Sequence, residues 1–403
     1  MRLAIFTEQI SHYHAARFRA AASLLSDVAI ISRSISALSP ELTAPGRCDL
    51  PIVALFDSPA AYRSAQASDG VWRRVFAALK SVKPDVIAVS GWANQESFAA
   101  IAWAKANGAR LVVMSDSQHH DAARARWREF IKSRVAKSYD AALVAGPSHR
   151  DYLAQLGLAR ERIFLGYDVV DNAHFAEGAE RARSGERGVS IALARQYVLA
   201  SARFIPKKNL PLLVRAYAAA LARVDAASAP DLVILGDGEE RPAIERAIVT
   251  ANAGGRVHLI GRHGYDALPH IYGRAEAFVH VSLSEQWGLV INEAAASGLP
   301  LIVSRPCGAA ATLVAPENGF LVDPQSEASI AEALVSIFRM PAEQRRRMGA
   351  ESRKRVADWG PARYAQGLSA AAEAARARPR RSLALADRAL LSVLARRTIE
   401  AVA

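Results

Sequence analysis

SEQWGLVINEAAASGLP, residues 284–300, is the stretch around which the rest of the chain is interpreted. Two carboxylates, Glu285 and Glu293, stand in it with seven residues between them. The preceding AFVHVSLS alternates and is rich in β-formers, which predicts a strand that ends near residue 284. Residues 289–297 predict a helix, because Gly298 follows in the C′ position with a proline just beyond. We therefore expect Glu285 in the strand-to-helix turn and Glu293 about one turn inside the helix.

The turn between the two glutamates has the features of an anion-binding site. Gly288 lets the backbone approach a ligand closely. The free amides at the helix start, beside Leu289 and Val290, attract negative charge. The flanking carboxylates can accept hydrogen bonds from hydroxyls. The stretch therefore suits a sugar nucleotide, and the alternative is a capping glutamate followed by a solvated helix glutamate.

The same stretch resembles the Glu-x7-Glu motif of retaining glycosyltransferases of family 4, which have the two-domain GT-B fold. The match continues over residues 198–324, and weaker signs reach the N-terminus. The expected fold class is therefore α/β, with two Rossmann-like parallel-sheet domains that face a cleft. The resemblance implies that Glu285 contacts the transferred sugar and that Glu293 holds the ribose.

Two basic residues follow the predicted strand at the start of YVLASARFIPKKNL, residues 197–210. In the family an arginine and a lysine at this place clamp the donor diphosphate, which implies that role for Arg203 and Lys208. Lys207 is an ambiguous neighbour, and solvated basic side chains are the alternative. Arg262, after the predicted strand VHLIG, is a weaker candidate for a base or phosphate contact.

Residues 1–170 alternate apolar strands with helical stretches, the pattern of a parallel sheet wrapped by helices. The first loop, EQISHYH, lacks the glycines that many family members carry there. Four basic residues of this loop and of the helix start after it are expected either to face an acceptor or to be solvated: His12, His14, Arg17 and Arg19. The predicted strands cover residues 2–7, 28–32, 86–89, 111–115 and 141–145.

Two further loops follow strands of this first domain. Ser90-Gly91-Trp92 stands at a strand end, where open α/β sheets place ligands. In MSDSQHHD, residues 114–121, the resemblance implies one residue near the donor sugar among Asp116, His119 and His120. We take His119 as the catalytic candidate, against the alternative of an ordinary loop histidine.

The 403 residues predict more than one domain. We expect an N-terminal acceptor-binding domain over residues 1–185, a nucleotide-sugar-binding domain over 186–375 and a basic C-terminal helix over 376–403. Residues 176–189 are polar and charged and predict a linker. The two cysteines, Cys48 and Cys307, are isolated in the sequence and indicate a reducing compartment.

The formal net charge is +12, and the last 66 residues contribute +9 through 15 basic and 6 acidic side chains. A basic segment of this kind binds anionic lipid or nucleic acid, and the sequence shows no recognisable nucleic-acid module. The basic helix predicted over residues 122–139 carries a stripe that is either buried or interfacial: Trp127, Phe130, Ile131 and Val135. The C-terminal helix offers the same two alternatives for Leu383, Leu390, Leu391, Leu394 and Ile399, with Arg388, Arg396 and Arg397 on its other face.

The N-terminus reads as a first buried strand rather than a signal peptide, and no apolar run of about 18 residues is present. We expect a cytoplasmic protein that can associate peripherally with the inner face of the membrane. The expected function is retaining transfer of a hexose from a UDP- or GDP-sugar to an acceptor hydroxyl on a glycan or lipid-linked intermediate. No cofactor and no metal are expected, because the chain has no Asp-x-Asp. The alternatives are a catalytically inactive sugar-nucleotide-binding or scaffold protein of the same fold, and a sugar-nucleotide epimerase.

Overall fold

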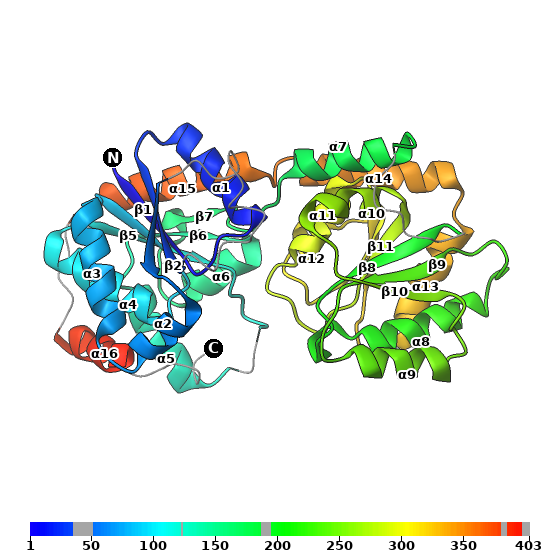
Figure 1. Ribbon diagram of the computed structural model, residues 1–403, viewed down its shortest axis with the longest axis horizontal. Coiled ribbons are helices and arrows are strands. Elements are labelled where there is room, and N and C mark those ends of the chain that lie inside the picture. Colours follow the sequence, from blue (N-terminus) through cyan, green and yellow to red (C-terminus); the bar gives the residue numbers. More distant parts are fainter. Residues whose placement is uncertain (35–50, 122–123, 187–194, 380–384, 397–403) are drawn as a thin grey trace. The chain divides into compact units, whose positions relative to one another are not determined.

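The computed structural model describes residues 1–34, 51–121, 124–186, 195–379 and 385–396, and the chain forms two compact units (Figure 1). Unit 1 comprises Met1–Val169 together with Pro361–Ala403, and unit 2 comprises Val170–Gly360. Each unit is a parallel sheet covered by helices, which confirms the predicted GT-B architecture of two Rossmann-like domains.

Unit 1 contains a sheet with the strand order β3-β2-β1-β4-β5-β6-β7 among the described residues. All of its neighbouring strands are parallel, and Leu3 of β1 pairs with Val28 on one side and Val86 on the other. Helices cover both faces, so the strands are nearly continuous apolar runs. The strands are β1 (Leu3–Thr7), β2 (Val28–Ser34), β3 (Ile52–Phe56), β4 (Val86–Ser90), β5 (Arg110–Ser115), β6 (Ala141–Val144) and β7 (Ile163–Leu165).

Two apolar clusters fill the two faces of this sheet. Phe18 of α1 and Tyr364 and Leu368 of α15 belong to one cluster, and Figure 1 shows the orange helix α15 alongside the blue α1. The other cluster includes Phe98 of α4 and Leu391 of α16. The helices are α1 (His12–Leu24), α2 (Pro59–Gln66), α3 (Gly70–Val82), α4 (Gln95–Asn107), α5 (Arg126–Ala136), α6 (Pro147–Gln155), α15 (Pro361–Arg376) and α16 (Leu385–Arg396).

Unit 2 contains a second parallel sheet, with the order β10-β9-β8-β11-β12-β13 among the described residues. Its strands are β8 (Tyr197–Ser201), β9 (Asp231–Leu235), β10 (Val257–Gly261), β11 (Ala275–His280), β12 (Leu301–Ser304) and β13 (Gly319–Val322). Its helices are α7 (Asn172–Arg183), α8 (Leu210–Leu221), α9 (Arg241–Thr250), α10 (Leu268–Gly273), α11 (Leu289–Ala296), α12 (Ala310–Leu313), α13 (Glu327–Arg339) and α14 (Ala342–Val356).

The predicted linker is wrong over residues 176–183, which belong to α7. The side chain of Asp171 caps this helix by accepting a hydrogen bond from the amide of His174 at 3.2 Å. Phe175 and Ala179 are buried on its inner face, and a Cβ on Gly273 of α10 would come within 2.6 Å of the Ala179 backbone. The many charged residues of α7 conceal this small apolar face in the sequence. Residues 187–189 of the predicted linker lie outside the described residues.

The division into units also differs from the expected boundaries at residues 185 and 375. It falls after Val169 and after Gly360. Helix α7 packs on α10 of unit 2, which moves the first boundary toward the N-terminus. Helix α15 packs on α1 and on strands β5, β6 and β7, so it belongs to unit 1.

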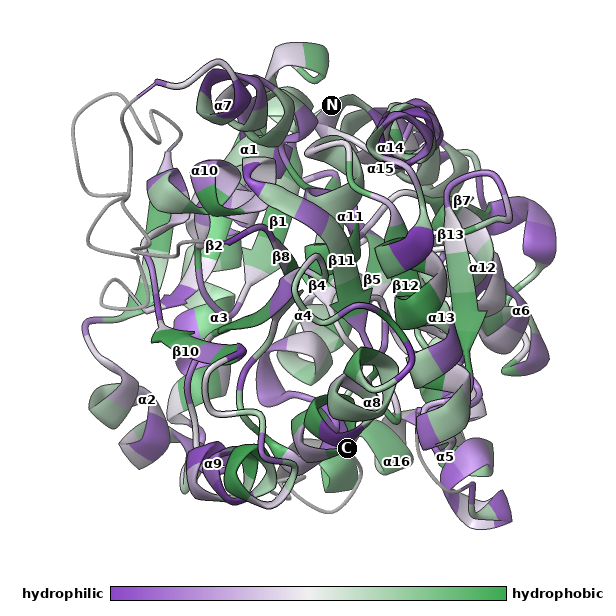
Figure 2. Ribbon diagram, turned by 90° about the vertical axis from the view of Figure 1, so that its right-hand side faces the viewer, coloured by the Kyte–Doolittle hydropathy of each residue, from purple (hydrophilic) through white to green (hydrophobic). Residues whose placement is uncertain are grey.

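Figure 2 shows the hydropathy of the strands and of the helices that cover them. Strands β11 and β12 appear in the green of hydrophobic residues, whereas α14 is mostly purple. Among the described residues, none of the helices combines the length and the apolar character that crossing a lipid bilayer requires.

Candidate active site

The predicted donor residues of unit 2 gather at one point of its sheet. From β8 the chain proceeds to β9 on one side and later returns to β11 on the other, so β8 and β11 are adjacent strands at a topological switch point. Open α/β sheets bind ligands outside the carboxyl ends of strands at such a point. Arg203 follows the end of β8 and Glu285 follows the end of β11.

The loop that carries Arg203 is fitted closely against the Gly-Asp-Gly turn after β9. Gly236 has φ +135° and Gly238 has φ +153°. A Cβ on Gly236 would collide with the carbonyl oxygen of Ala202, and one on Gly238 would lie 2.5 Å from that of Phe204. Only glycines fit at these two positions. The Arg203 side chain itself is exposed, just beyond the carboxyl end of β8.

An ion pair joins the two sides of the switch point. Nζ of Lys208 donates a hydrogen bond to Oε2 of Glu285, and the two side chains are only 10% and 12% exposed. Nζ of Lys207 lies 3.7 Å from Oε1 of the same carboxylate. Lys208 is the last residue of a single turn of 3-10 helix after β8, Pro206–Lys208, which positions its side chain toward Glu285. The structure therefore brings together the predicted lysine and the first predicted glutamate.

The surroundings of Glu285 keep it ionised. Burial alone favours the neutral acid, but His280 and the Lys208 ammonium outweigh burial and hold the pKa of Glu285 well below its ordinary value of 4.5. Nε2 of His280 lies 3.7 Å from Oε2 of Glu285 and 3.0 Å from Oγ of Ser282. Burial lowers the pKa of His280, so this histidine is neutral at pH 7.

Gly288 ends the turn and begins the helix, as predicted. Its φ is +95°, a left-handed conformation that favours glycine, and it stands at the N-cap of α11. The amides of Leu289 and Val290 belong to the first turn of α11, where backbone N–H groups lack intrahelical acceptors. Both residues are half-buried. This helix start therefore places partial positive charge close to Glu285.

The turn itself is anchored to neighbouring backbone. The carbonyl of Glu285 accepts a hydrogen bond from the amide of Gly308 at 3.1 Å, and that of Trp287 accepts from Ala309 at 3.0 Å. The Trp287 indole, 2% exposed, donates from Nε1 to Oδ1 of Asn292 at 2.8 Å. Its ring also packs on Trp359, with 5.1 Å between the ring centroids. The position of the Glu285 carboxylate is thus fixed by the fold.

Glu293 is placed differently from Glu285. It is 1% exposed, and its Oε2 accepts a hydrogen bond at 2.7 Å from the hydroxyl of Tyr272, a residue of α10. The carboxylate is therefore engaged within unit 2, and its contact with a ribose stays a prediction.

Arg262 lies at the same edge of the sheet as the Gly-Asp-Gly turn. It is exposed after β10. The hydrogen bond from Arg241 is the main cause that lowers the pKa of Asp237, and the charge of Arg262 adds to that effect. Arg262 is therefore close to the turn that supports Arg203, although its contact with a base or phosphate remains a prediction.

His119 belongs to unit 1, so the predicted catalytic residues are divided between the two units. It is exposed in the loop after β5 and makes edge-to-face contacts with His120 and Tyr152, with ring centroids 5.3 and 6.1 Å away. Its carbonyl accepts a hydrogen bond at 2.7 Å from Nε of Arg124.

Two residues of the first loop and helix serve the fold of unit 1 rather than facing an acceptor. Arg17 is 3% exposed and donates to Asp168 at 3.2 Å and to the carbonyl of Val169. Nδ1 of His14 accepts a hydrogen bond from the amide of Ser11 at 3.3 Å at the start of α1. Burial, assisted by Arg17, lowers the pKa of His14 to about 3.

The two helices for which buried and interfacial alternatives were left open differ in exposure. In α5 only Val135 of the predicted stripe is fully buried, whereas Trp127 and Phe130 are 57% and 65% exposed. In α16 Leu391 and Leu394 are buried in the core of unit 1, which favours core packing. Leu383, Ile399 and Arg397 lie outside the described residues.

The part of the chain that the structure describes contains no group of three or more His, Cys, Asp or Glu side chains arranged to hold a metal ion. Arg203, Lys207, Lys208 and the start of α11 carry positive charge at the switch point of unit 2.

Comparison with known proteins agrees with this architecture. The family model "Glycosyl transferases group 1" matches residues 187–355, and the model "Glycosyl transferase 4-like domain" matches residues 13–168. The Anabaena protein HepE, solved with UDP and glucose, superimposes with a TM-score of 0.70 at 15% identity over 92% of this chain and 98% of that one. Sucrose-phosphate synthase from Thermosynechococcus elongatus has a TM-score of 0.69 at 20% identity, covering 92% of this chain and 97% of that one.

Two curated relatives match over shorter stretches. Probable sucrose-phosphate synthase 5 of rice is 34% identical over 35% of this chain but only 15% of its own length. The GDP-mannose-dependent alpha-(1-6)-phosphatidylinositol monomannoside mannosyltransferase of Mycobacterium tuberculosis is 29% identical over 47% of this chain and 48% of that protein. The matched stretch thus spans about a seventh of the rice enzyme and about half of the mycobacterial one.

The two parallel-sheet units, with basic side chains and a carboxylate at the switch point of the second, have the GT-B fold. With family matches over both units, the chain belongs to the glycosyltransferases of the family 4 type.

Proposed function

We propose that the chain is a retaining glycosyltransferase that moves a hexose from a nucleoside-diphosphate sugar to an acceptor hydroxyl without a resident metal. One observation carries the proposal: a largely enclosed, ionised Glu285, 12% exposed, is held by Lys208 beside the start of α11, at the switch point of unit 2. The carboxylate suits hydroxyls of the transferred sugar, and the surrounding cations suit its diphosphate.

The charges at the switch point are close to those a diphosphate needs. Arg203, Lys207 and Lys208 carry three positive charges, Glu285 removes one, and a helix start adds roughly half. The sum, about two and a half, offsets the two negative charges of a sugar-linked diphosphate. Stabilising charge on the leaving group as the glycosidic bond breaks is the main contribution that such a site can make to catalysis.

The proposed transfer follows from that arrangement. The acceptor oxygen bonds to the anomeric carbon as the bond from that carbon to the diphosphate oxygen breaks. The departing diphosphate takes the acceptor proton, so no side chain has to act as a nucleophile. Glu293 would hold the ribose, Arg262 the base or a phosphate, and His119 of unit 1 a hydroxyl of the sugar.

The relatives suggest the donor. HepE was solved with UDP and glucose, and the mycobacterial mannosyltransferase is GDP-mannose-dependent. We therefore propose a UDP- or GDP-sugar as donor and a glycan or lipid-linked intermediate as acceptor.

A thermal-shift screen tests the proposed donor. A ligand that binds the native state stabilises it by mass action, by about 2.7 kcal/mol at a hundred times its dissociation constant. UDP-glucose or GDP-mannose should raise the melting temperature of the wild type, and the rise should be lost in Lys208→Met. The exposed Glu317→Gln of unit 2 is the matched control. No shift with any nucleotide sugar would contradict the proposed donor site.

Helix α5 supports a peripheral membrane location on a cytoplasmic leaflet. The exposed Trp127 and Phe130 provide apolar anchors, Arg126 is exposed on the same helix, and Lys137 is exposed at its C-cap. Each basic residue near an anionic membrane surface contributes roughly 1 kcal/mol to the binding free energy. Exposed aromatic rings add to binding by inserting between the lipid headgroups.

Liposome flotation tests this location. Anionic vesicles should bind the protein and neutral vesicles should not, and binding should weaken at high salt. The double variant Trp127→Ala/Phe130→Ala should reduce it, whereas Val249→Ala, at a residue of unit 2 that is 79% exposed, should not. Equal recovery with both kinds of vesicle would remove the electrostatic argument.

A further inference from the structure

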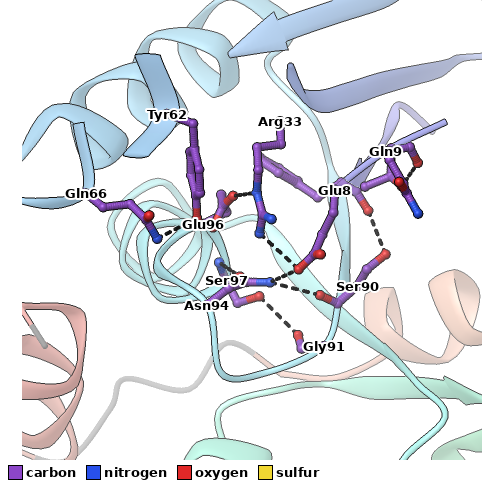
Figure 3. A network of polar contacts seen from close by, with 12 residues as sticks. Glu8, Gln9, Arg33, Tyr62, Gln66, Ser90, Gly91, Asn94, Glu96 and Ser97 are labelled. Carbon is purple, nitrogen blue, oxygen red and sulfur yellow. Dashed lines mark hydrogen bonds and ion pairs between the residues drawn. The ribbon is translucent and has the colours of Figure 1, made fainter. Parts of the chain in front are cut away.

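The two units order the ends of their central strands through different kinds of contact. In unit 1 the chain leaves β1 toward β2 and later returns to β4 on the opposite side of β1, so this unit has a switch point of its own. Figure 3 shows Arg33 there between two carboxylates: Nε donates to Oε1 of Glu96 at 2.6 Å, and Nη2 donates to Oε1 of Glu8 at 2.9 Å. At the switch point of unit 2, a pair of aromatic rings lies next to each glutamate of the candidate site.

The pair next to Glu285 includes the residue before the point where the chain leaves unit 2. Trp359 precedes Gly360, the last residue of this unit, and is 7% exposed. Its ring packs on that of Trp287, with 5.1 Å between the centroids. Trp287 lies in the turn that carries Glu285, and its Nε1 donates to Oδ1 of Asn292 at 2.8 Å. Trp359 therefore supports, through Trp287, the turn that orients the Glu285 carboxylate.

The pair next to Glu293 includes a residue just after the chain enters unit 2, which begins at Val170. Phe175 of α7 is fully buried and meets Tyr272 of α10 edge to face, with 5.8 Å between the ring centroids. The Tyr272 hydroxyl donates to Oε2 of Glu293 at 2.7 Å. Phe175 therefore supports, through Tyr272, the carboxylate of Glu293.

The two segments that carry these outer rings are fixed within unit 2. A Cβ on Gly178 of α7 would lie 2.5 Å from Cβ of Pro269 in α10, so these two helices are in close contact. Asn172, the first residue of α7, donates from Nδ2 to the carbonyl of Val356, the last residue of α14, at 2.8 Å. This bond joins the segment by which the chain enters unit 2 to the segment by which it leaves.

We propose that Trp359 and Phe175 are positioning residues of the candidate site, each acting through its aromatic neighbour. Trp359 holds Glu285, and Phe175 holds Glu293. The inference rests on the proposed transfer function, in which Glu285 contacts the transferred sugar and Glu293 the ribose. Because protein interiors are close-packed, removing a ring leaves a cavity and lets the neighbouring ring shift. A shift of about 1 Å at a group that acts on the reacting atoms can lower the rate about a hundredfold.

The two glutamates have different proposed roles, so the two aromatic residues should affect different kinetic constants. A sugar contact that strengthens as charge develops acts in the transition state. Trp359→Leu should therefore lower kcat of slow donor hydrolysis about tenfold and change KM by less than about threefold. A ribose contact acts in the ground state and the transition state alike, so Phe175→Leu should raise KM about fivefold and change kcat less. Trp359→Phe keeps a ring beside Trp287 and should restore most of kcat.

Steady-state hydrolysis by the full chain measures both constants, with UDP-glucose or GDP-mannose as the donor, whichever raises the melting temperature in the thermal-shift screen. Rates are expressed per folded protein, from urea unfolding curves of each variant. Phe338→Leu is the matched control, because its ring pairs with Tyr217 of the same unit, 6.0 Å between centroids, on helices that carry no predicted site residue. This variant should leave both constants unchanged.

Fluorine NMR of the protein labelled with 5-fluorotryptophan tests the contact without turnover, even where a leucine variant does not fold. The Trp359 resonance is identified by its absence in Trp359→Phe. It should shift when the same nucleotide sugar saturates the site, because the ring lies against Trp287 of the donor turn. The resonance of Trp103, buried in α4 of unit 1, should not shift.

An unshifted Trp359 resonance, wild-type constants in both leucine variants, or the same change of kcat and KM in both would overturn the inference. Glu285→Gln and Glu293→Gln are measured in parallel. If these two variants also keep wild-type constants, the proposed function is wrong. If they show the expected split and the aromatic variants do not, only the positioning roles are wrong.

Discussion

Replacing Lys208 by methionine tests the ion pair at the centre of the site. The substitution keeps the length of the side chain and removes its charge, which leaves Glu285, whose side chain is 12% exposed, beside a neutral His280. Removing one partner of a buried pair costs about 3–5 kcal/mol. Lys207, whose Nζ is 3.7 Å from Glu285, can compensate in part. We therefore expect a loss of about 3 kcal/mol in the free energy of unfolding, at the lower end of that range.

The loss depends on pH in a predictable direction. The folded pKa of Glu285 is depressed below 4.5, so the pair stabilises the native state fully above about pH 4.5. The contribution disappears as the pH falls through the folded pKa. The difference between wild type and Lys208→Met should therefore be largest near pH 7 and should begin to narrow below about pH 4.5.

Urea unfolding followed by tryptophan fluorescence measures this difference, because the buried Trp287 lies two residues from Glu285. Lys207→Met is the matched control: its side chain is 35% exposed, and the loss should stay below about 1 kcal/mol. The double variant Lys208→Met/Glu285→Gln should recover part of the loss, since no unpaired charge remains buried. Equal losses for the two lysine variants, or no measurable loss for Lys208→Met, would refute the reasoning.

Three other predictions concern the donor site. Glu293→Gln should weaken donor binding about tenfold in calorimetric titrations. Tyr272→Phe removes the hydroxyl that donates to the Glu293 carboxylate and should weaken donor binding less. Unchanged donor affinity in Glu293→Gln would contradict the ribose role. Gly288→Ala should lower stability by about 1–2 kcal/mol in the same urea assay, because φ is +95° there, and a neutral effect would contradict that geometry. Donor turnover should survive EDTA, whereas Arg203→Ala should slow it about a hundredfold or more; turnover that EDTA abolishes and magnesium restores would contradict the charge assignment.

Local signals were sufficient for most of the fold and for the turn at the centre of the site. The residues that determine the β11–α11 connection are contiguous in the sequence, with Gly288 at the left-handed position and Gly298 after the helix. The geometry of this connection could therefore be predicted. The strands next to both switch points could also be predicted, because buried parallel strands are continuous apolar runs.

The contacts that were missed are long-range. Arg17 pairs with Asp168, 151 residues away, and no local pattern distinguishes it from a solvated arginine. Tyr272 reaches Glu293 from another helix, and Arg33 joins Glu8 and Glu96 across separations of 25 and 63 residues.

For the aromatics of α5 the sequence left the buried and the interfacial alternatives open. Helical spacing of Trp127 and Phe130 shows that they share a face, but not whether another element covers that face. In α7 the linker prediction was wrong, because a charged composition concealed a narrow buried side.

The anomer released by slow donor hydrolysis tests the central claim most directly. Wild-type protein is mixed with UDP-glucose or GDP-mannose, both α-linked donors, and the anomeric protons of the first sugar released are followed by NMR before mutarotation. We predict that the α-anomer appears first, and that its rate falls in Glu285→Gln and in Lys208→Met. Initial release of the β-anomer would contradict a retaining mechanism. Release at wild-type rate in both variants, or no release from either donor, would contradict the assignment of the site.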